Sequence, residues 1–190
     1  MKKQLLLAAF TLSFTLSFSQ YDYEPSGDFP YGRPNPNGPK ELNDWKGVIG
    51  TCECKSVARL NQTTWTDTVN MIWTFKYIMN GMAVQDETLK EDGVHSGSIR
   101  QFNSDSSKWY VHYYSNAAAT PTLGSWEGNK TQDGNIVLYK KSPSPNGLDG
   151  FYRLTFSEIN EKGFNWVGEW VNESETFVYP TWQIFCNRKE

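Results

Sequence analysis

The chain has 190 residues, with 18 basic and 21 acidic side chains and a formal net charge of −3. This excess of acid argues against nucleic acid and anionic membranes as partners, because neither attracts a net anion. Aromatic residues make up 15% of the chain and include eight tryptophans, which predicts one β-rich globular domain rather than a disordered chain.

The first segment of the chain predicts export. Two lysines at positions 2 and 3 precede a short apolar stretch at 5–16, and a Ser-Phe-Ser triplet at 17–19 matches a signal-peptidase site. A transmembrane anchor is the alternative, but the stretch is too short and too rich in Ser and Thr to span a bilayer. Because no cysteine follows it, we also expect no lipid anchor. We therefore expect a signal peptide at 1–19 and a periplasmic or extracellular protein.

Residues 20–44 have a different composition, with five of the nine prolines and three tyrosines. Proline lacks the backbone N–H that a sheet needs and favours extended geometry, so we expect an N-terminal arm here. The aromatic residues of the arm indicate that it packs on a surface. A protein partner or a second copy of the chain is one candidate for that surface. The globular domain is expected at 45–190.

Alternation of apolar and polar residues dominates the chain after residue 45, and no helical pattern stands out. Ten segments are typical of strands: 51–60, 67–79, 82–90, 98–102, 109–115, 125–130, 135–141, 151–156, 164–171 and 176–186. In the second segment one face holds Val69, Met71, Trp73, Phe75, Tyr77 and Met79. Turn pairs such as Asn80-Gly81 and Asp133-Gly134 separate the segments.

The number and length of these segments predict an all-β fold. About ten strands joined by short turns are typical of an antiparallel sandwich or barrel. The first two strands are long, which favours an up-and-down meander that closes into a barrel. An immunoglobulin-like sandwich is the alternative, but it needs shorter strands and crossing connections.

Three cysteines are present: Cys52, Cys54 and Cys186. Export makes a disulfide feasible, and closure of a barrel often brings the first and last strands together. We therefore expect one bridge from Cys186 to either Cys52 or Cys54, with one thiol left over. A metal site is the alternative, but this spacing lacks a clear fourth ligand. His95 and His112 would be needed to complete it, and we expect no metal.

Several segments taken in order resemble a bacterial lipocalin-like family known as domain of unknown function 1579. The match covers about residues 35–188 and rests on PNPNGPKEL, WKGVIGTCE, GSIRQFNSDSSKW, FYRLTF and FNWVGEW. The resemblance implies a calycin-type barrel with an internal cavity and implies no chemistry. In that family the first strand often reads G-x-W, whereas here Cys52 follows Gly50 and Thr51. The resemblance therefore implies that one barrel end lacks its tryptophan plug.

Charged residues on strands beside large apolar neighbours are the first candidate ligand contacts. Arg100 shares a face with Phe102, and Arg153 shares a face with Phe151. An arginine that points inward must be paired, because an isolated buried charge is costly. Asp86 or Glu87 is the natural partner. Such an arginine either binds an anionic group of a ligand or forms a salt bridge at the barrel mouth.

Aromatic and imidazole side chains are the second set of candidates. His112 lies between Tyr110 and Tyr114 on one face of a strand, and this face is either a wall of the cavity or the outer surface. Trp166 lies beside Gly168, which leaves a gap above the sheet. That gap admits either a ligand ring or a side chain from a facing strand.

These residues favour a protein that binds a small, partly apolar ligand inside a barrel. The motifs of P-loop, dinucleotide-binding, zinc-protease and serine-hydrolase sites are missing, so no cofactor is expected. Two alternatives stay open. One is an interaction module that uses the arm, and the other is an isomerase, cyclase or lyase with His112, Asp86 or a tyrosine as acid or base.

Overall fold

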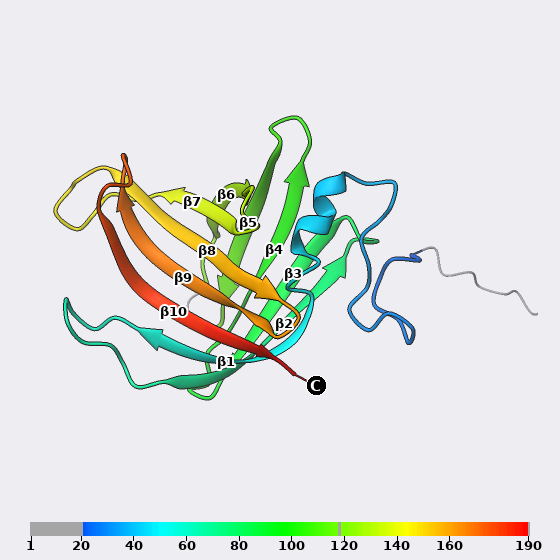
Figure 1. Cartoon of the computed structure of the whole chain (residues 1–190), viewed down its shortest axis with the longest axis horizontal. Coiled ribbons are helices and arrows are strands. Elements are labelled where there is room, and N and C mark those ends of the chain that lie inside the picture. Colours follow the sequence, from blue (N-terminus) through cyan, green and yellow to red (C-terminus); the bar gives the residue numbers. More distant parts are fainter. Residues whose placement is uncertain (1–20, 118, 190) are drawn as a thin grey trace, which may run out of the picture.

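A closed antiparallel barrel of ten strands forms the body of the protein (Figure 1). The computed structural model describes residues 21–117 and 119–189, so the expected signal peptide at 1–19 lies outside the described residues. The strands are β1 Gly50–Ala58, β2 Val69–Ile78, β3 Ala83–Lys90, β4 His95–Asn103, β5 Lys108–Ser115, β6 Gly124–Lys130, β7 Ile136–Lys141, β8 Gly150–Asn160, β9 Gly163–Asn172 and β10 Val178–Arg188.

The topology is the predicted up-and-down meander. Each strand pairs with its neighbours in the chain, and β1 pairs with β10 to close the sheet. The ten expected segments all coincide with strands, and the immunoglobulin-like alternative is wrong because the sheet closes on itself. On β2 the alternating residues Met71, Trp73, Phe75 and Tyr77 are buried as expected. Met79 is exposed, because the chain has already entered the turn with a φ of 54°.

One end of the barrel is covered by the 3-10 helix η1, Lys40–Trp45 (Figure 1). Trp45 is fully buried there, and its ring packs edge-on against Trp109 at 5.8 Å and Phe156 at 5.3 Å between centroids. The resemblance implied an end without a tryptophan plug, since Cys52 occupies the expected position. The structure corrects this expectation, because a tryptophan from the preceding helix fills that end.

The arm before η1 packs on the barrel of its own chain. Its main contacts are with the β2–β3 turn, where the Tyr23 N–H donates to Asn80 Oδ1 at 3.2 Å and the Asn80 N–H donates to Glu24 Oε1 at 2.6 Å. Gly81 in this turn has a φ of 76°, and a Cβ there would lie 2.4 Å from the carbonyl oxygen of Arg33. The turn therefore needs glycine for its conformation and for the close approach of the arm.

The disulfide joins the two strands that close the barrel. Cys54 of β1 and Cys186 of β10 are directly paired in register and bonded to each other, and they are 132 positions apart in sequence. Cys52 is the free cysteine and is buried. The structure thus confirms the expected bridge and selects Cys54 as the partner of Cys186.

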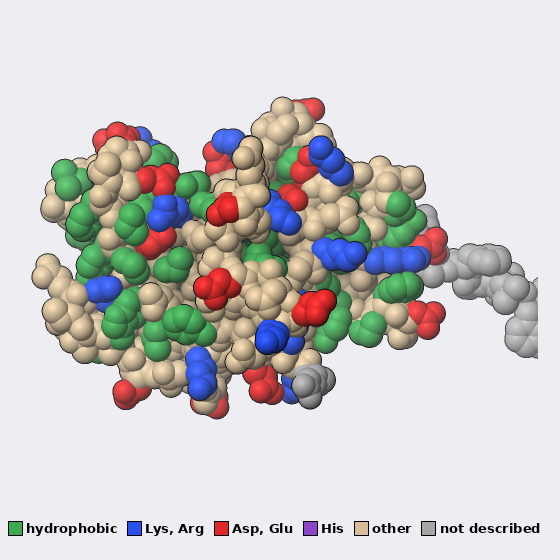
Figure 2. Space-filling view, viewed as in Figure 1, with side chains coloured by type: hydrophobic (Ala, Val, Ile, Leu, Met, Phe, Trp, Pro, Cys, Tyr) green, Lys and Arg blue, Asp and Glu red, His purple; other side chains and the backbone are tan. Residues whose placement is uncertain are grey.

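Exposed apolar side chains occur at both ends of the barrel. Acidic and basic side chains are interspersed over the face seen in Figure 2. The exposed apolar residues at the end opposite η1 lie on or beside the loops: Leu60, Leu123, Leu148, Phe177 and Val178. Met79 and Met82 are exposed in the β2–β3 turn at the η1 end. Over the ranges 21–117 and 119–189, no helix has the length and hydropathy needed to cross a membrane.

Candidate functional site: the barrel cavity

The barrel encloses a cavity of about 190 Å³ between the η1 end and the loops of the opposite end. One wall is apolar and mostly aromatic, and it includes Trp126, Leu138, Tyr152, Leu154, Trp166 and Trp182. The other wall is polar and comes from β3 and β4: Asp86, Thr88, Lys90, Ser96, Ser98 and Arg100. The cavity is therefore amphipathic across its width.

The polar wall consists of pairs of residues that face each other across β3 and β4, and each pair forms one level of the wall. Thr88 lies opposite Ser96, and Asp86 lies opposite Ser98. Because side chains alternate across a strand, these residues and Arg100 all point to the same side of the sheet. At the level nearer the mouth the Thr88 and Ser96 hydroxyl oxygens are 2.6 Å apart.

Asp86 is the centre of a buried hydrogen-bond network at the deeper level. Its carboxylate accepts the indole N–H of Trp73 at 2.7 Å and the hydroxyl of Ser98 at 2.5 Å. It also forms an ion pair with Arg100, and both side chains are almost fully buried, with exposed fractions of 4% and 3%. A buried carboxylate with three donors is well satisfied, which favours a structural role for Asp86.

Arg100 connects the cavity floor to the covered end of the barrel. Its guanidinium lies 4.5 Å from the ring centroid of Trp45 and 5.0 Å from that of Phe75. Cations favour the faces of aromatic rings, and more so where water is excluded. Arg100 thus contacts both the Asp86 carboxylate and the ring of Trp45, which fills the covered end of the barrel.

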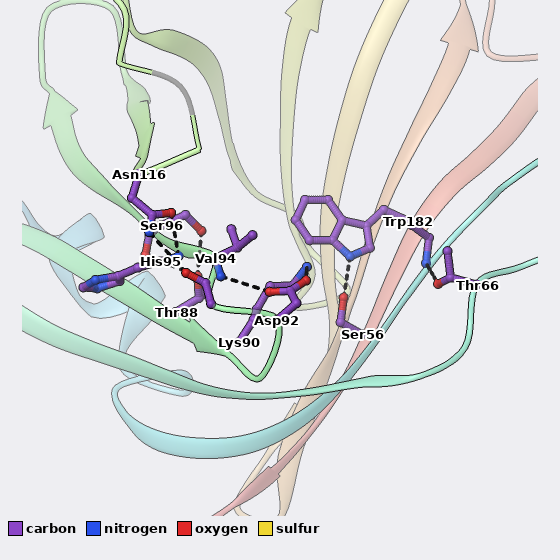
Figure 3. Close-up of polar contacts among 12 residues, drawn as sticks. Ser56, Thr66, Thr88, Lys90, Asp92, Val94, His95, Ser96, Asn116 and Trp182 are labelled. Carbon is purple, nitrogen blue, oxygen red and sulfur yellow. Dashed lines mark hydrogen bonds and ion pairs between the residues drawn. The ribbon is translucent and has the colours of Figure 1, made fainter.

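The mouth of the cavity lies beside the β3–β4 turn (Figure 3). Lys90 ends β3 there, with its Nζ 3.7 Å from Asp92 Oδ2 and 5.2 Å from the ring centroid of Trp182. Trp182 is itself fixed, because its indole N–H donates to the Ser56 hydroxyl at 2.7 Å. Lys90, Val94 and Trp182 are only partly buried, so the cavity reaches solvent at this point.

Three of the six candidate ligand contacts predicted from sequence line this cavity: Asp86, Arg100 and Trp166. The expected pairing of Arg100 with Asp86 is present. The gap at Gly168 is filled by the protein itself, because a Cβ there would lie 2.7 Å from the hydroxyl of Tyr152 and 2.8 Å from the ring of Trp166. Of the two occupants considered for that gap, the structure shows side chains.

Arg153 faces away from the cavity. Its neighbours in sequence, Tyr152 and Leu154, line the cavity, whereas Arg153 forms ion pairs with Glu169 and Glu175 on the outer side of the sheet. The salt-bridge interpretation is therefore the one that the structure supports for this arginine.

His112 and Tyr114 also face outward, because Val111 and Tyr113 of the same strand line the cavity. His112 Nδ1 lies 2.8 Å from the Ser125 hydroxyl, and the Tyr114 hydroxyl accepts a hydrogen bond from Gln85 Nε2 at 2.9 Å. The expectation that these two residues contact a ligand in the barrel is thus not met. A period of two assigns residues to two faces without telling which face is inside.

Five further lining residues are not among the contacts predicted from sequence: Thr88, Lys90, Ser96, Ser98 and Trp182. A signal for four of them was present, because Thr88 and Lys90 follow Asp86 at two-residue steps and Ser96 and Ser98 precede Arg100 in the same way. Placing Asp86 and Arg100 inside would have placed these four residues inside as well. Trp182 had no such link to a candidate.

The cavity lining also bears on the metal and catalytic interpretations. Within residues 21–117 and 119–189, no three His, Cys, Asp or Glu side chains lie close enough together to hold a metal ion. Of the residues considered as acid or base for an enzyme, Asp86 lines the cavity, as do the tyrosines Tyr113 and Tyr152, whereas His112 faces outward. The cavity offers hydrogen-bonding groups and apolar surface, which are the features of a binding site.

No protein-family model matches the chain, and a search of curated proteins finds no match.

Proposed function

We propose that this is an exported binding protein that holds one small, partly apolar ring compound inside its barrel. The observation that carries the proposal is the cavity of about 190 Å³, which has an aromatic wall, a polar wall and a mouth between half-buried residues. Membership of the lipocalin-like family named above is part of the proposal, and the closed ten-stranded barrel supports it.

The size of the cavity limits the ligand. An apolar protein cavity of about 150 Å³ is enough to bind benzene, whereas sites for drug-sized molecules measure roughly 300–1,000 Å³. A cavity of about 190 Å³ therefore suits a single ring with one or two small substituents. Long-chain lipids and haem are too large for it.

The aromatic wall favours a ring over an aliphatic chain. Trp166 and Trp182 pack edge-to-face, with centroids 5.1 Å apart and an interplanar angle of 80°. A ligand ring that enters beside them can adopt the same edge-to-face or offset geometry, which adds to the free energy of simple apolar burial. The partly buried lining residues Lys90, Val94 and Trp182 favour entry at the mouth beside the β3–β4 turn.

The disulfide supports the export part of the proposal. Cys54 and Cys186 are bonded to each other, and such bonds persist mainly in oxidising compartments. The expected signal peptide points in the same direction.

Two measurements test the proposed function. Native and denaturing mass spectra of the exported protein should differ by the mass of any ligand that it retains. Calorimetric titration of the empty protein should then show binding of phenol or indole and no binding of palmitate, which exceeds the cavity.

A pair of tryptophan substitutions locates the binding. Leu154→Trp fills the cavity from β8 and should abolish binding of the ring compounds, whereas Leu89→Trp on the exposed outer face of β3 should leave it unchanged. Absence of binding by the wild-type protein, or equal binding by both variants, would refute the proposal.

A further inference from the structure

The charged residues that line the cavity carry a net positive charge, because two of them are basic and one is acidic. Asp86 and Arg100 pair with each other at the floor, which leaves Lys90 as the third charged residue of the lining. The Lys90 side chain is 15% exposed, and its partner Asp92, 3.7 Å away, is 42% exposed and outside the lining. A long ion pair with a solvated carboxylate is weak. The mouth therefore carries a positive charge that a ligand can use.

Lys90 is also held in position over the opening. Its Nζ lies 5.2 Å from the ring centroid of Trp182, and the Ser56 hydroxyl fixes that indole. Figure 3 shows Lys90 and Asp92 at the β3–β4 turn, next to Trp182. An anionic group bound there keeps part of its hydration, so its desolvation costs less than deep burial would. The mouth is therefore the favourable place for a carboxylate.

The hydroxyl groups of the polar wall have a different preference, because they are uncharged and already hydrogen-bonded in part. Ser98 donates to Asp86 at 2.5 Å, so its oxygen offers a ligand only lone pairs. The Thr88 and Ser96 hydroxyl oxygens are 2.6 Å apart, and either of them can be the donor of that hydrogen bond. A ligand hydroxyl, which both donates and accepts, therefore suits this wall.

The spacing along β3 between Lys90 and the Thr88–Ser96 pair suits a ligand with one ring. Lys90 and the Thr88–Ser96 level are two residues apart along β3, and two residues of a strand advance about 6.6 Å. That advance is close to the span of a benzene ring with a hydroxyl and a carboxylate in para positions. The volume of the cavity sets the same limit on size.

We propose that the cavity selects an aromatic hydroxy acid, with its hydroxyl hydrogen-bonded to the Ser96–Ser98 wall and its carboxylate at Lys90. This inference rests on the proposed binding function and specifies the ligand class. The aromatic wall, formed in part by Trp166 and Trp182, faces the ring.

Titration calorimetry of the mature protein with four compounds tests the inference: 4-hydroxybenzoate, benzoate, phenol and 4-hydroxybenzamide. A charge-assisted contact at Lys90 should make 4-hydroxybenzoate bind about tenfold more tightly than phenol or 4-hydroxybenzamide. Loss of the hydroxyl donor should make benzoate bind about fivefold more weakly than 4-hydroxybenzoate.

Two substitutions at the mouth should act in opposite directions. Lys90→Gln should remove the preference for the carboxylate, so that 4-hydroxybenzoate binds no more tightly than phenol. Asp92→Asn removes the competing carboxylate, keeps an oxygen for the Val94 N–H that Asp92 accepts at 3.0 Å, and should strengthen binding of 4-hydroxybenzoate. Lys55→Gln on the exposed face of β1 is the matched control and should change neither affinity.

Each outcome of these titrations either supports or overturns the proposed ligand class. Equal affinities for 4-hydroxybenzoate, phenol and the amide would overturn the inference while leaving the proposed binding function standing. An unchanged carboxylate preference in Lys90→Gln would also overturn it, because the charge would then act elsewhere. If none of the four compounds binds, both the inference and the proposed function fail.

Discussion

Replacing Asp86 by Asn should destabilise the protein strongly, and removing Arg100 as well should restore part of the loss. The substitution keeps the shape of the side chain and removes its charge. Arg100 then becomes a cation with an exposed fraction of 3% and no counter-charge in the cavity lining. Two further donors, the Trp73 indole and the Ser98 hydroxyl, lose a charged acceptor.

The magnitude follows from burial of the pair. Breaking a buried ion pair by removing one partner costs roughly 3–5 kcal/mol, because the remaining charge is left uncompensated. The aromatic contacts of Arg100 with Trp45 and Phe75 soften this cost without neutralising the charge. In the Asp86→Asn, Arg100→Met double variant no charge remains, so we expect it to recover about 1–3 kcal/mol relative to Asp86→Asn.

Urea denaturation followed by tryptophan fluorescence gives the free energy of unfolding for the wild type, the two single variants and the double variant. Glu53→Ala is the control, since its ion pair with Lys189 spans 3.7 Å between side chains that are more than half exposed, and such pairs contribute at most about 1 kcal/mol. A loss below about 1 kcal/mol for Asp86→Asn, or a double variant less stable than Asp86→Asn, would refute this reasoning.

Two further predictions concern the disulfide and pH. Replacing both Cys54 and Cys186 by Ser should lower stability by about 5 kcal/mol in the chain-entropy model, because the bridge closes a loop across 132 positions; a change in the urea midpoint equivalent to less than about 1 kcal/mol would contradict it. Burial raises the pKa of the Asp44 carboxyl above 3.8, although the Trp109 indole N–H donates to it. The folded state then binds that proton more tightly than the unfolded state does, so the Asp44 contribution to stability should rise as pH falls toward 3.8. Asp44→Asn keeps an acceptor for Trp109 and should remove this rise, so identical pH profiles of the unfolding free energy in the wild type and the variant would contradict the assignment.

Much of the fold could be predicted from local pattern. Alternation of apolar residues and the turn pairs between segments located all ten strands, because both signals act over a few residues and need no knowledge of distant contacts. The bridge between the first and last strands could be predicted as a consequence of closure. The choice of Cys54 over Cys52 could not, because both lie on the same face of β1 and only the register with β10 distinguishes them.

The site was harder to predict for the same reason. Asp86, Arg153 and His112 each lie on an alternating strand, and alternation is unchanged when the two faces are exchanged. Only closure of the barrel decided that Asp86 points inward and that Arg153 and His112 point outward. Trp45 was assigned to the start of the domain, and only the three-dimensional packing of η1 showed that it fills one barrel end.

By itself, then, the sequence determined the class of fold, the positions of the strands and the residues that share a face, because these depend on neighbours in the chain. The tertiary structure alone decided which faces enclose the cavity, how large it is, and that Lys90 stands at its mouth with the Ser96–Ser98 wall below. Those properties depend on residues far apart in sequence meeting across the barrel, and the pattern of no single strand contains that information.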